Sequence, residues 1–173
     1  DALYAWIASA LRAGDKASAG NVLPRLRKLA SHPMIAALDA RVAVENGRAG
    51  EALDILRAAL RRHGTTRPLA GHYVDILQRA GMIEEAKRAV TDYLRVWLDD
   101  PGLLAQLARA NFELGSLAEG HLAQAESLRQ RDQLAAAIDL LELARKAGGD
   151  YYTQSIVDAR LRDWNALLKE EKA

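Results

Sequence analysis

The sequence predicts an all-α protein, a right-handed solenoid of about ten antiparallel helices closed by a C-terminal capping helix. One reason is that small residues recur every 34 positions, as in Gly47, Gly81 and Gly115 and in Ala52, Ala86 and Gly120. A period of that length with a glycine turn inside it is typical of stacked helix–turn–helix units. The other reason is that apolar residues recur three and four apart along the whole chain, whereas the alternation of a strand is absent.

Turn-forming residues divide the apolar stretches into successive helices. In chain order they are residues 14–15, 32–33, 46–47, 64–68, 81, 99–102, 115–116, 131–132 and 148–150. Because these turns are short, consecutive helices are expected to run antiparallel. Pro24 is an exception to the pattern, since a proline inside a helix costs about 3 kcal/mol. We expect a kink or a shortened helix at that position.

The paired helices resemble the tetratricopeptide repeat, well at residues 33–66 and 67–100 and more loosely at 1–32 and 101–131. Ala52 and Ala86 are expected to be the contact points where the second helix of a pair approaches the first. Large residues are expected to fill the remaining gaps, namely Leu56, Val90, Tyr93 and Trp97. The domain organisation predicted is 1–131 as repeats and 132–173 as a helical hairpin or cap continuous with the solenoid.

The last helix, roughly residues 151–169, carries one apolar seam that is suited to covering the end of a solenoid. Its members are Val157, Leu161, Trp164 and Leu168. We expect the seam to pack on the helix that contains Ile138 and Leu141, with Tyr151 or Tyr152 closing the preceding turn. The charged tail after it is expected to stay in water. The alternative is a solvent-exposed helix that serves only as a tether.

Composition argues against several classes of function. A formal net charge of +1 gives no global attraction to nucleic acid or acidic lipid, and the basic clusters at residues 25–28 and at Arg57, Arg61 and Arg62 are interpreted as solvated helix faces. RNA binding is therefore a minor alternative. The chain has no cysteine and no apolar run long enough to span a membrane. Because it opens on Asp1, we expect an excised or processed piece with any targeting signal upstream.

No pattern of catalytic or metal-binding residues is evident. The four histidines, His32, His63, His72 and His121, lack the spacing of a zinc site and are expected to be surface or capping residues. Hydroxyl residues at 31, 65, 66 and 116 are expected to cap helices. The acidic pairs are placed at a helix start (84–85) and at an exposed helix end (99–100). The chain is therefore predicted not to be an enzyme and to hold no cofactor or metal.

Protein binding is the remaining candidate, because the first helix of each tetratricopeptide pair lines a concave groove. Its groove positions in this sequence are Tyr4, Arg12, Arg41, Glu45, Asp75, Arg79, Arg109, Phe112 and Glu113. Arginines outnumber acids there, which favours an acidic or extended peptide as the partner. A charged face that serves only solubility is the alternative. The carboxylate clamp of chaperone-binding relatives needs asparagines where this chain has Ala8, Arg41, Asp75 and Arg109, so that specialisation is not expected.

Residues 118–164 resemble the C-terminal end of BepA-like periplasmic zinc metallopeptidases, which enhance assembly of outer-membrane β-barrels. The resemblance is carried by three groups, which are Ala118-Glu119-Gly120, Ala137-Ile138 with Leu141 and Ala144, and Asp158-Ala159-Arg160. It implies a non-catalytic, periplasmic module that packs on a peptidase domain and engages outer-membrane protein precursors or the barrel-assembly machinery. The HExxH motif of that family does not occur here, so zinc is expected only on a separate peptidase domain. A free-standing scaffold of a cytoplasmic complex is the alternative.

Overall fold

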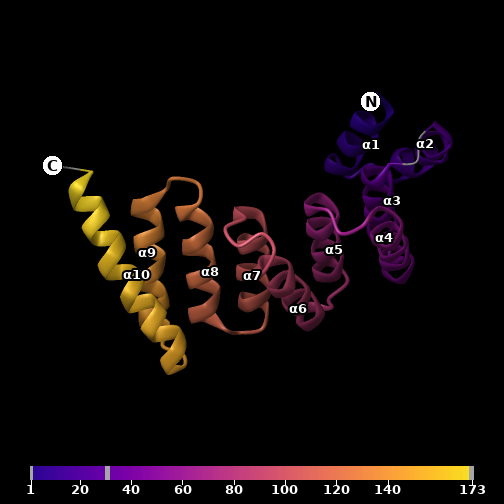
Figure 1. Cartoon of the computed structure of the whole chain (residues 1–173). Helices are drawn as coiled ribbons and strands as arrows, with labels where there is room; N and C mark the ends of the chain where they lie inside the picture. The colour runs from indigo at the N-terminus through magenta and orange to yellow at the C-terminus, as the bar shows by residue number, and fades with distance from the viewer. Residues whose placement is uncertain (1, 30–31, 172–173) are drawn as a thin grey trace. The chain divides into compact units, whose positions relative to one another are not determined.

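The computed structural model describes residues 2–29 and 32–171, whose regular structure consists of ten helices without a strand (Figure 1). This confirms the predicted fold class and the number of helices. The helices are α1 (Ala2–Arg12), α2 (Lys16–Leu29), α3 (Pro33–Glu45), α4 (Ala49–His63), α5 (Arg67–Arg79), α6 (Ile83–Leu94), α7 (Pro101–Glu113), α8 (Leu117–Arg129), α9 (Leu134–Ala147) and α10 (Tyr151–Glu170). They form two compact units, Asp1–Met82 and Ile83–Ala173. The division predicted between repeats and cap at residue 131 stays a prediction.

The first unit contains α1 to α5 around a core of aliphatic side chains from α1, α2 and α3. These are Ile7, Leu11, Ala19, Leu23, Ile35, Leu38 and Val42. The turn from α3 to α4 depends on Gly47, whose φ of 75° lies in the left-handed region that favours glycine. Ala52, five residues later, is fully buried as the repeat pattern predicts.

The second unit contains α6 to α10, and α7, α8 and α9 follow one another through short turns at alternate ends (Figure 1). A core cluster of this unit lies among α8, α9 and α10 and consists of Ala125, Leu134, Ala137, Ile138, Leu141, Ala144, Val157, Leu161 and Trp164. Ala86 and Val90 of α6 are fully buried, as expected. Trp97 lies beyond the end of α6, where its ring is tilted against that of Tyr93 at a centroid distance of 6.2 Å.

Helix α10 packs on the end of the second unit, which confirms the seam expected from its sequence. Val157, Leu161 and Trp164 are buried in one cluster with Ile138 and Leu141, and Leu168 packs against this cluster. The expectation for the preceding turn was wrong, because Tyr151 and Tyr152 are 89% and 74% exposed. Gln154 closes that turn instead: its Nε2 donates to the carbonyl oxygens of Ala144 and Gly148. An amide that reaches back across a glycine turn has no signature in the apolar pattern.

The helix caps differ from those expected. Thr66 and Ser116 occupy N-cap positions but donate and accept no capping bond through their side chains, Thr65 is an exposed residue before the cap, and Ser31 lies outside the described residues. The capping side chains are Asp15, His32, Asp100 and Asp150, each of which accepts a hydrogen bond from a backbone N–H two or three residues later. Carboxylates suit these positions because the helix N-terminus is the positive end of its dipole.

The prediction that Asp100 lies at an exposed helix end was therefore wrong, because Asp100 is the N-cap residue of α7. Its Oδ1 accepts from Leu103 N at 2.8 Å. Asp100→Ala is expected to destabilise the second unit by about 1 kcal/mol, because an N-cap carboxylate satisfies a donor that otherwise has no partner in the helix. Urea denaturation followed by circular dichroism measures the change.

Asp99→Ala is the matched control, because it removes the same charge one residue earlier from an exposed side chain. Equal losses from the two substitutions would contradict the capping role of Asp100.

Two further local expectations need correction. Helix α2 is not shortened at Pro24, which lies exposed inside it, while the kink expected as the alternative stays a prediction. The histidines are not all surface or capping residues: His32 caps α3 through Nδ1, whereas His72 and His121 are half-buried. The basic residues Arg61 and Arg62 are exposed, as expected. The side chains of residues 25–29 lie outside the described part.

Candidate functional site

The predicted groove residues are divided between the two units, and each set is treated by itself. In the first unit, Arg12 lies exposed at the end of α1, Arg41 and Glu45 lie on α3, and Asp75 and Arg79 lie on α5. The side chain of Tyr4 is outside the described residues. In the second unit, Arg109, Phe112 and Glu113 all lie on α7. Their role in partner binding stays a prediction.

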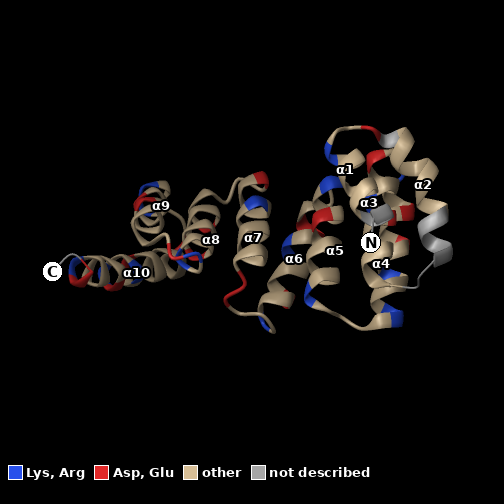
Figure 2. Ribbon diagram, turned by 90° about the horizontal axis from the view of Figure 1, so that it is seen from above, with Lys and Arg blue, Asp and Glu red and all other residues tan. Residues whose placement is uncertain are grey.

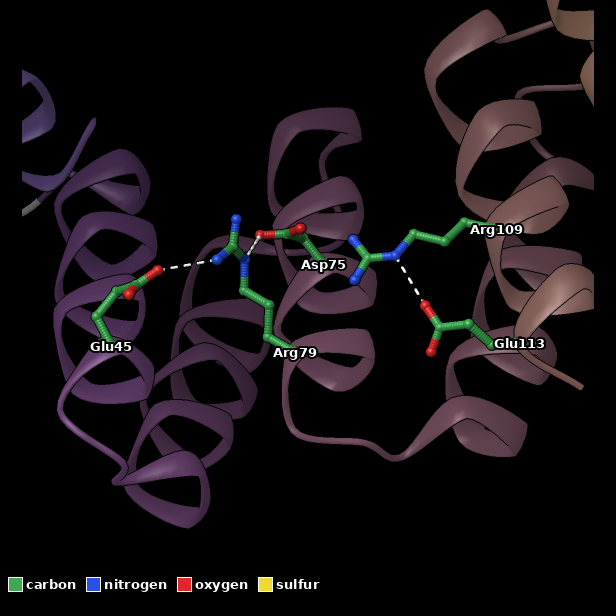
Figure 3. Close-up of polar contacts among 5 residues, drawn as sticks. All are labelled: Glu45, Asp75, Arg79, Arg109 and Glu113. Carbon is green, nitrogen blue, oxygen red and sulfur yellow. Dashed lines mark hydrogen bonds and ion pairs between the residues drawn. The ribbon is translucent and has the colours of Figure 1, made fainter. Parts of the chain in front are cut away.

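In the first unit, Arg79 is held by two carboxylates (Figure 3). Its Nη1 lies 2.8 Å from Glu45 Oε1 on the neighbouring helix α3, and its Nε donates to Asp75 Oδ2 at 2.8 Å. The three side chains are 23% to 34% exposed, so solvent screens the pairs and each contributes little to stability. A partner carboxylate that bound Arg79 would have to compete with both acids.

Arg41 differs from Arg79, because its Nε is covered without a hydrogen-bond acceptor. Its charge acts on His72 of the adjacent helix α5. Burial is the main cause that lowers the pKa of His72; the charges of Arg41 and Arg67 lower it further, and Asp75 opposes them. His72 therefore favours its neutral form.

In the second unit, Arg109 donates from Nε to Glu113 Oε1 at 2.9 Å along the same helix (Figure 3). Phe112 is half-buried and packs edge-on against His121 at a centroid distance of 5.0 Å. A Cβ at Gly120 would lie 2.5 Å from the Phe112 ring. Gly120, the small residue that the 34-residue period points to, thus leaves room for this ring.

A second feature of this unit was not found from the sequence. Arg160 of α10 donates to Glu126 of α8 at 2.7 Å. The pair lies at a hollow of about 320 Å³ that is also lined by Asp99, Arg129, Gln130, Asp132 and Trp164. Glu126 and Arg160 are 34 residues apart, as are Glu45 and Arg79. The repeat period applied to charges as well as to small residues would have found both pairs.

Acidic and basic side chains are interspersed in each unit (Figure 2). Within the described part of the chain, no group of three or more histidine, aspartate or glutamate side chains is arranged to hold a metal ion. None of the helices in residues 2–29 and 32–171 is both long and apolar enough to cross a bilayer.

No protein-family model matches the sequence. A search of curated proteins also gives no match. The fold is similar to that of solved structures. One is the structure titled MamA RS-1 ArsTM double mutant, which aligns with a TM-score of 0.61 at 12% sequence identity. The alignment covers 97% of this chain and 95% of the MamA chain. MamA from residue 41 to its end, from Desulfovibrio magneticus RS-1, has a TM-score of 0.59 at 12% identity, covering 99% and 96%. This likeness concerns the fold, and it supports the tetratricopeptide-like helical solenoid that the repeat pattern predicts.

Proposed function

We propose that this chain is a non-catalytic protein-interaction module. The observation that supports the proposal is the contact between α3 and α5, where Arg79 is bonded to both Glu45 and Asp75. These residues, with Arg41 on α3, occupy positions that the repeat pattern predicts to line a groove. Such a surface presents charged and polar groups on rigid elements, which suits recognition of an extended peptide. The module carries out no chemistry and needs no cofactor.

We further propose that the module belongs to a cell-envelope zinc metalloprotease of the BepA-like type. The support is the resemblance in residues 118–164, whose motif residues lie on α8, α9 and α10. Under this proposal the module is periplasmic, packs on its own peptidase domain and engages outer-membrane protein precursors or barrel-assembly proteins. Zinc is held by the peptidase domain. The second candidate is a free-standing scaffold of a cytoplasmic complex.

The two candidates differ in what the gene encodes upstream of Asp1. The protease hypothesis requires that this upstream region encode a signal peptide and a helix with HExxH. Sequencing the gene upstream of Asp1 distinguishes the two hypotheses. An upstream region that encodes neither would contradict the protease reading and leave the scaffold.

Binding is tested with a chemically unfolded outer-membrane β-barrel protein that is diluted from denaturant onto the fluorescently labelled chain. We expect saturable binding that weakens as salt is raised, because exposed charges at the contact are screened. The double variant Arg41→Gln with Arg109→Gln should weaken binding several-fold. Fluorescence anisotropy measures the affinities.

Arg61→Gln with Arg62→Gln provides the matched control, because it removes the same charge from exposed positions on α4. Equal weakening by both double variants would show that only net charge matters. Absence of binding to the unfolded protein would contradict the proposed class of partner.

A further inference from the structure

We propose that a hollow between α9 and the C-terminal half of α10 docks an acidic, amphipathic segment of a partner protein. The hollow has a volume of about 420 Å³. It is lined by Glu142 and Arg145 of α9 and by Leu161, Arg162, Asn165, Ala166 and Lys169 of α10. None of these residues is a groove position predicted from the repeat pattern, so the inference goes beyond the proposed function and does not rest on it.

The α10 side of the hollow is a stripe of exposed residues next to the buried seam of the same helix. Its members are Arg162, Asn165, Ala166 and Lys169. Because they are three, four and seven positions apart, they share one face of the helix. Helix α10 has 20 residues and α9 has 14, so α9 cannot cover the whole length of α10. The stripe is therefore left open to solvent.

The hollow contains more basic than acidic side chains. Its one acid, Glu142, is paired with Arg145 on the same helix. Arg162 and Lys169 have no carboxylate within ion-pair distance in residues 2–29 and 32–171. Three cations and one acid give this surface two positive charges in excess, although the formal net charge of the whole chain is only +1. This surplus favours a negatively charged partner.

The same hollow also has apolar and hydrogen-bonding groups. Leu161, which is 5% exposed, and Ala166 contribute apolar surface to it. The Nδ2 of Asn165 donates to the carbonyl oxygen of Leu161 at 2.8 Å, which leaves its Oδ1 to accept a bond from a partner. An apolar centre with charged residues around it is the arrangement typical of a protein interface.

An acidic helix suits this surface better than other anions. A helix can lay its apolar face between two helices and place glutamates at three- and four-residue spacing against the surrounding cations. A nucleic acid would leave the apolar surface unused, because its affinity comes mainly from phosphates that contact basic residues. A bilayer presents a broad surface that does not enter a hollow between two helices. The partner is therefore a protein segment rich in glutamate or aspartate with leucine-like side chains between them.

The docking surface is tested on the whole chain with fluorescently labelled peptides. The first consists of three repeats of Glu-Ala-Leu-Leu, the second has glutamine in place of glutamate, and the third has alanine in place of leucine. We expect saturable binding of the first peptide that weakens as salt is raised, and about tenfold weaker binding of the other two. Fluorescence anisotropy measures the affinities. The side-chain amide signals of Asn165 should shift in nuclear magnetic resonance spectra as the first peptide binds.

Arg162→Gln with Lys169→Gln should weaken binding of the first peptide about fivefold to tenfold, because each exposed charge pair contributes modestly. Ala166→Glu should weaken it at least as much, since it places a carboxylate against the acids of the peptide and keeps a residue that favours a helix. Arg88→Gln with Arg131→Gln is the matched control, because it removes the same charge from exposed residues of the second unit that do not line the hollow. It should leave the affinity nearly unchanged.

Equal weakening by the two double variants, equal binding of the glutamine peptide, or unmoved Asn165 signals at saturation would overturn the proposal. Two further results would assign the surface to another occupant and overturn it as well. One is binding to phosphatidylglycerol vesicles, but not to the acidic peptide, that is lost in Arg162→Gln with Lys169→Gln. The other is self-association, measured by light scattering, that the same double variant abolishes.

Discussion

Trp164→Ala is expected to destabilise the second unit by about 3 to 5 kcal/mol, the usual cost of truncating a buried tryptophan. The ring is only 5% exposed and lies in the cluster of α8, α9 and α10 side chains that includes Ile138 and Leu141. Since neighbouring backbones relax only in part, the substitution leaves a cavity where the indole was. Urea denaturation followed by circular dichroism should show the midpoint lowered by about 2 M.

Trp6→Ala is the control for this experiment. Trp6 is 46% exposed and lies on α1 in the other unit, so its truncation should change stability by less than about 1 kcal/mol. An unchanged midpoint for Trp164→Ala would show that α10 does not cap the core and would favour the tether interpretation of this helix.

Deletion of residues 151–173 is expected to have a still larger effect, because it removes all of α10. Val157 and Leu161 leave the core together with Trp164, and burial of each of these two aliphatic side chains contributes about 1.5 to 3 kcal/mol beyond the loss of the tryptophan. The apolar side of α9, with Ile138 and Leu141, is uncovered by the same change. A solenoid whose end is not covered associates through that face, so the shortened protein should aggregate or lose helical content per residue.

Size-exclusion chromatography with light scattering and circular dichroism measure both outcomes. Deletion of residues 169–173 is the control, because Lys169, Glu170 and Glu171 are exposed and form no part of the core cluster. The shorter deletion should leave a stable monomer. A soluble, monomeric and fully helical product of the long deletion would contradict the capping role of α10.

The amino-acid sequence by itself determined the helices and much of the core. Glycine turns such as Gly47 and Gly81 require positive φ, and their 34-residue spacing reports the length of one helical pair. The buried positions of Ala52, Ala86 and Leu161 follow from the same regularity, because a helix that packs through one face repeats its apolar residues every three or four positions. These features depend on local backbone geometry and on the spacing of apolar residues along the chain. Both can be predicted from the sequence without knowing which helices are neighbours.

The polar contacts were decided by the tertiary structure. Sequence reasoning treated Arg41, Arg79 and Arg109 as equivalent groove cations, whereas Arg79 is held by Glu45 and Asp75 and Arg109 by Glu113. The half-burial of His72 and the turn closed by Gln154 likewise need side chains from another helix or turn to be in place. An ion pair or a covered donor depends on distances of about 3 Å between atoms that lie far apart in the chain. Periodicity places a residue on a face, but only the packed helices determine which partner it meets there.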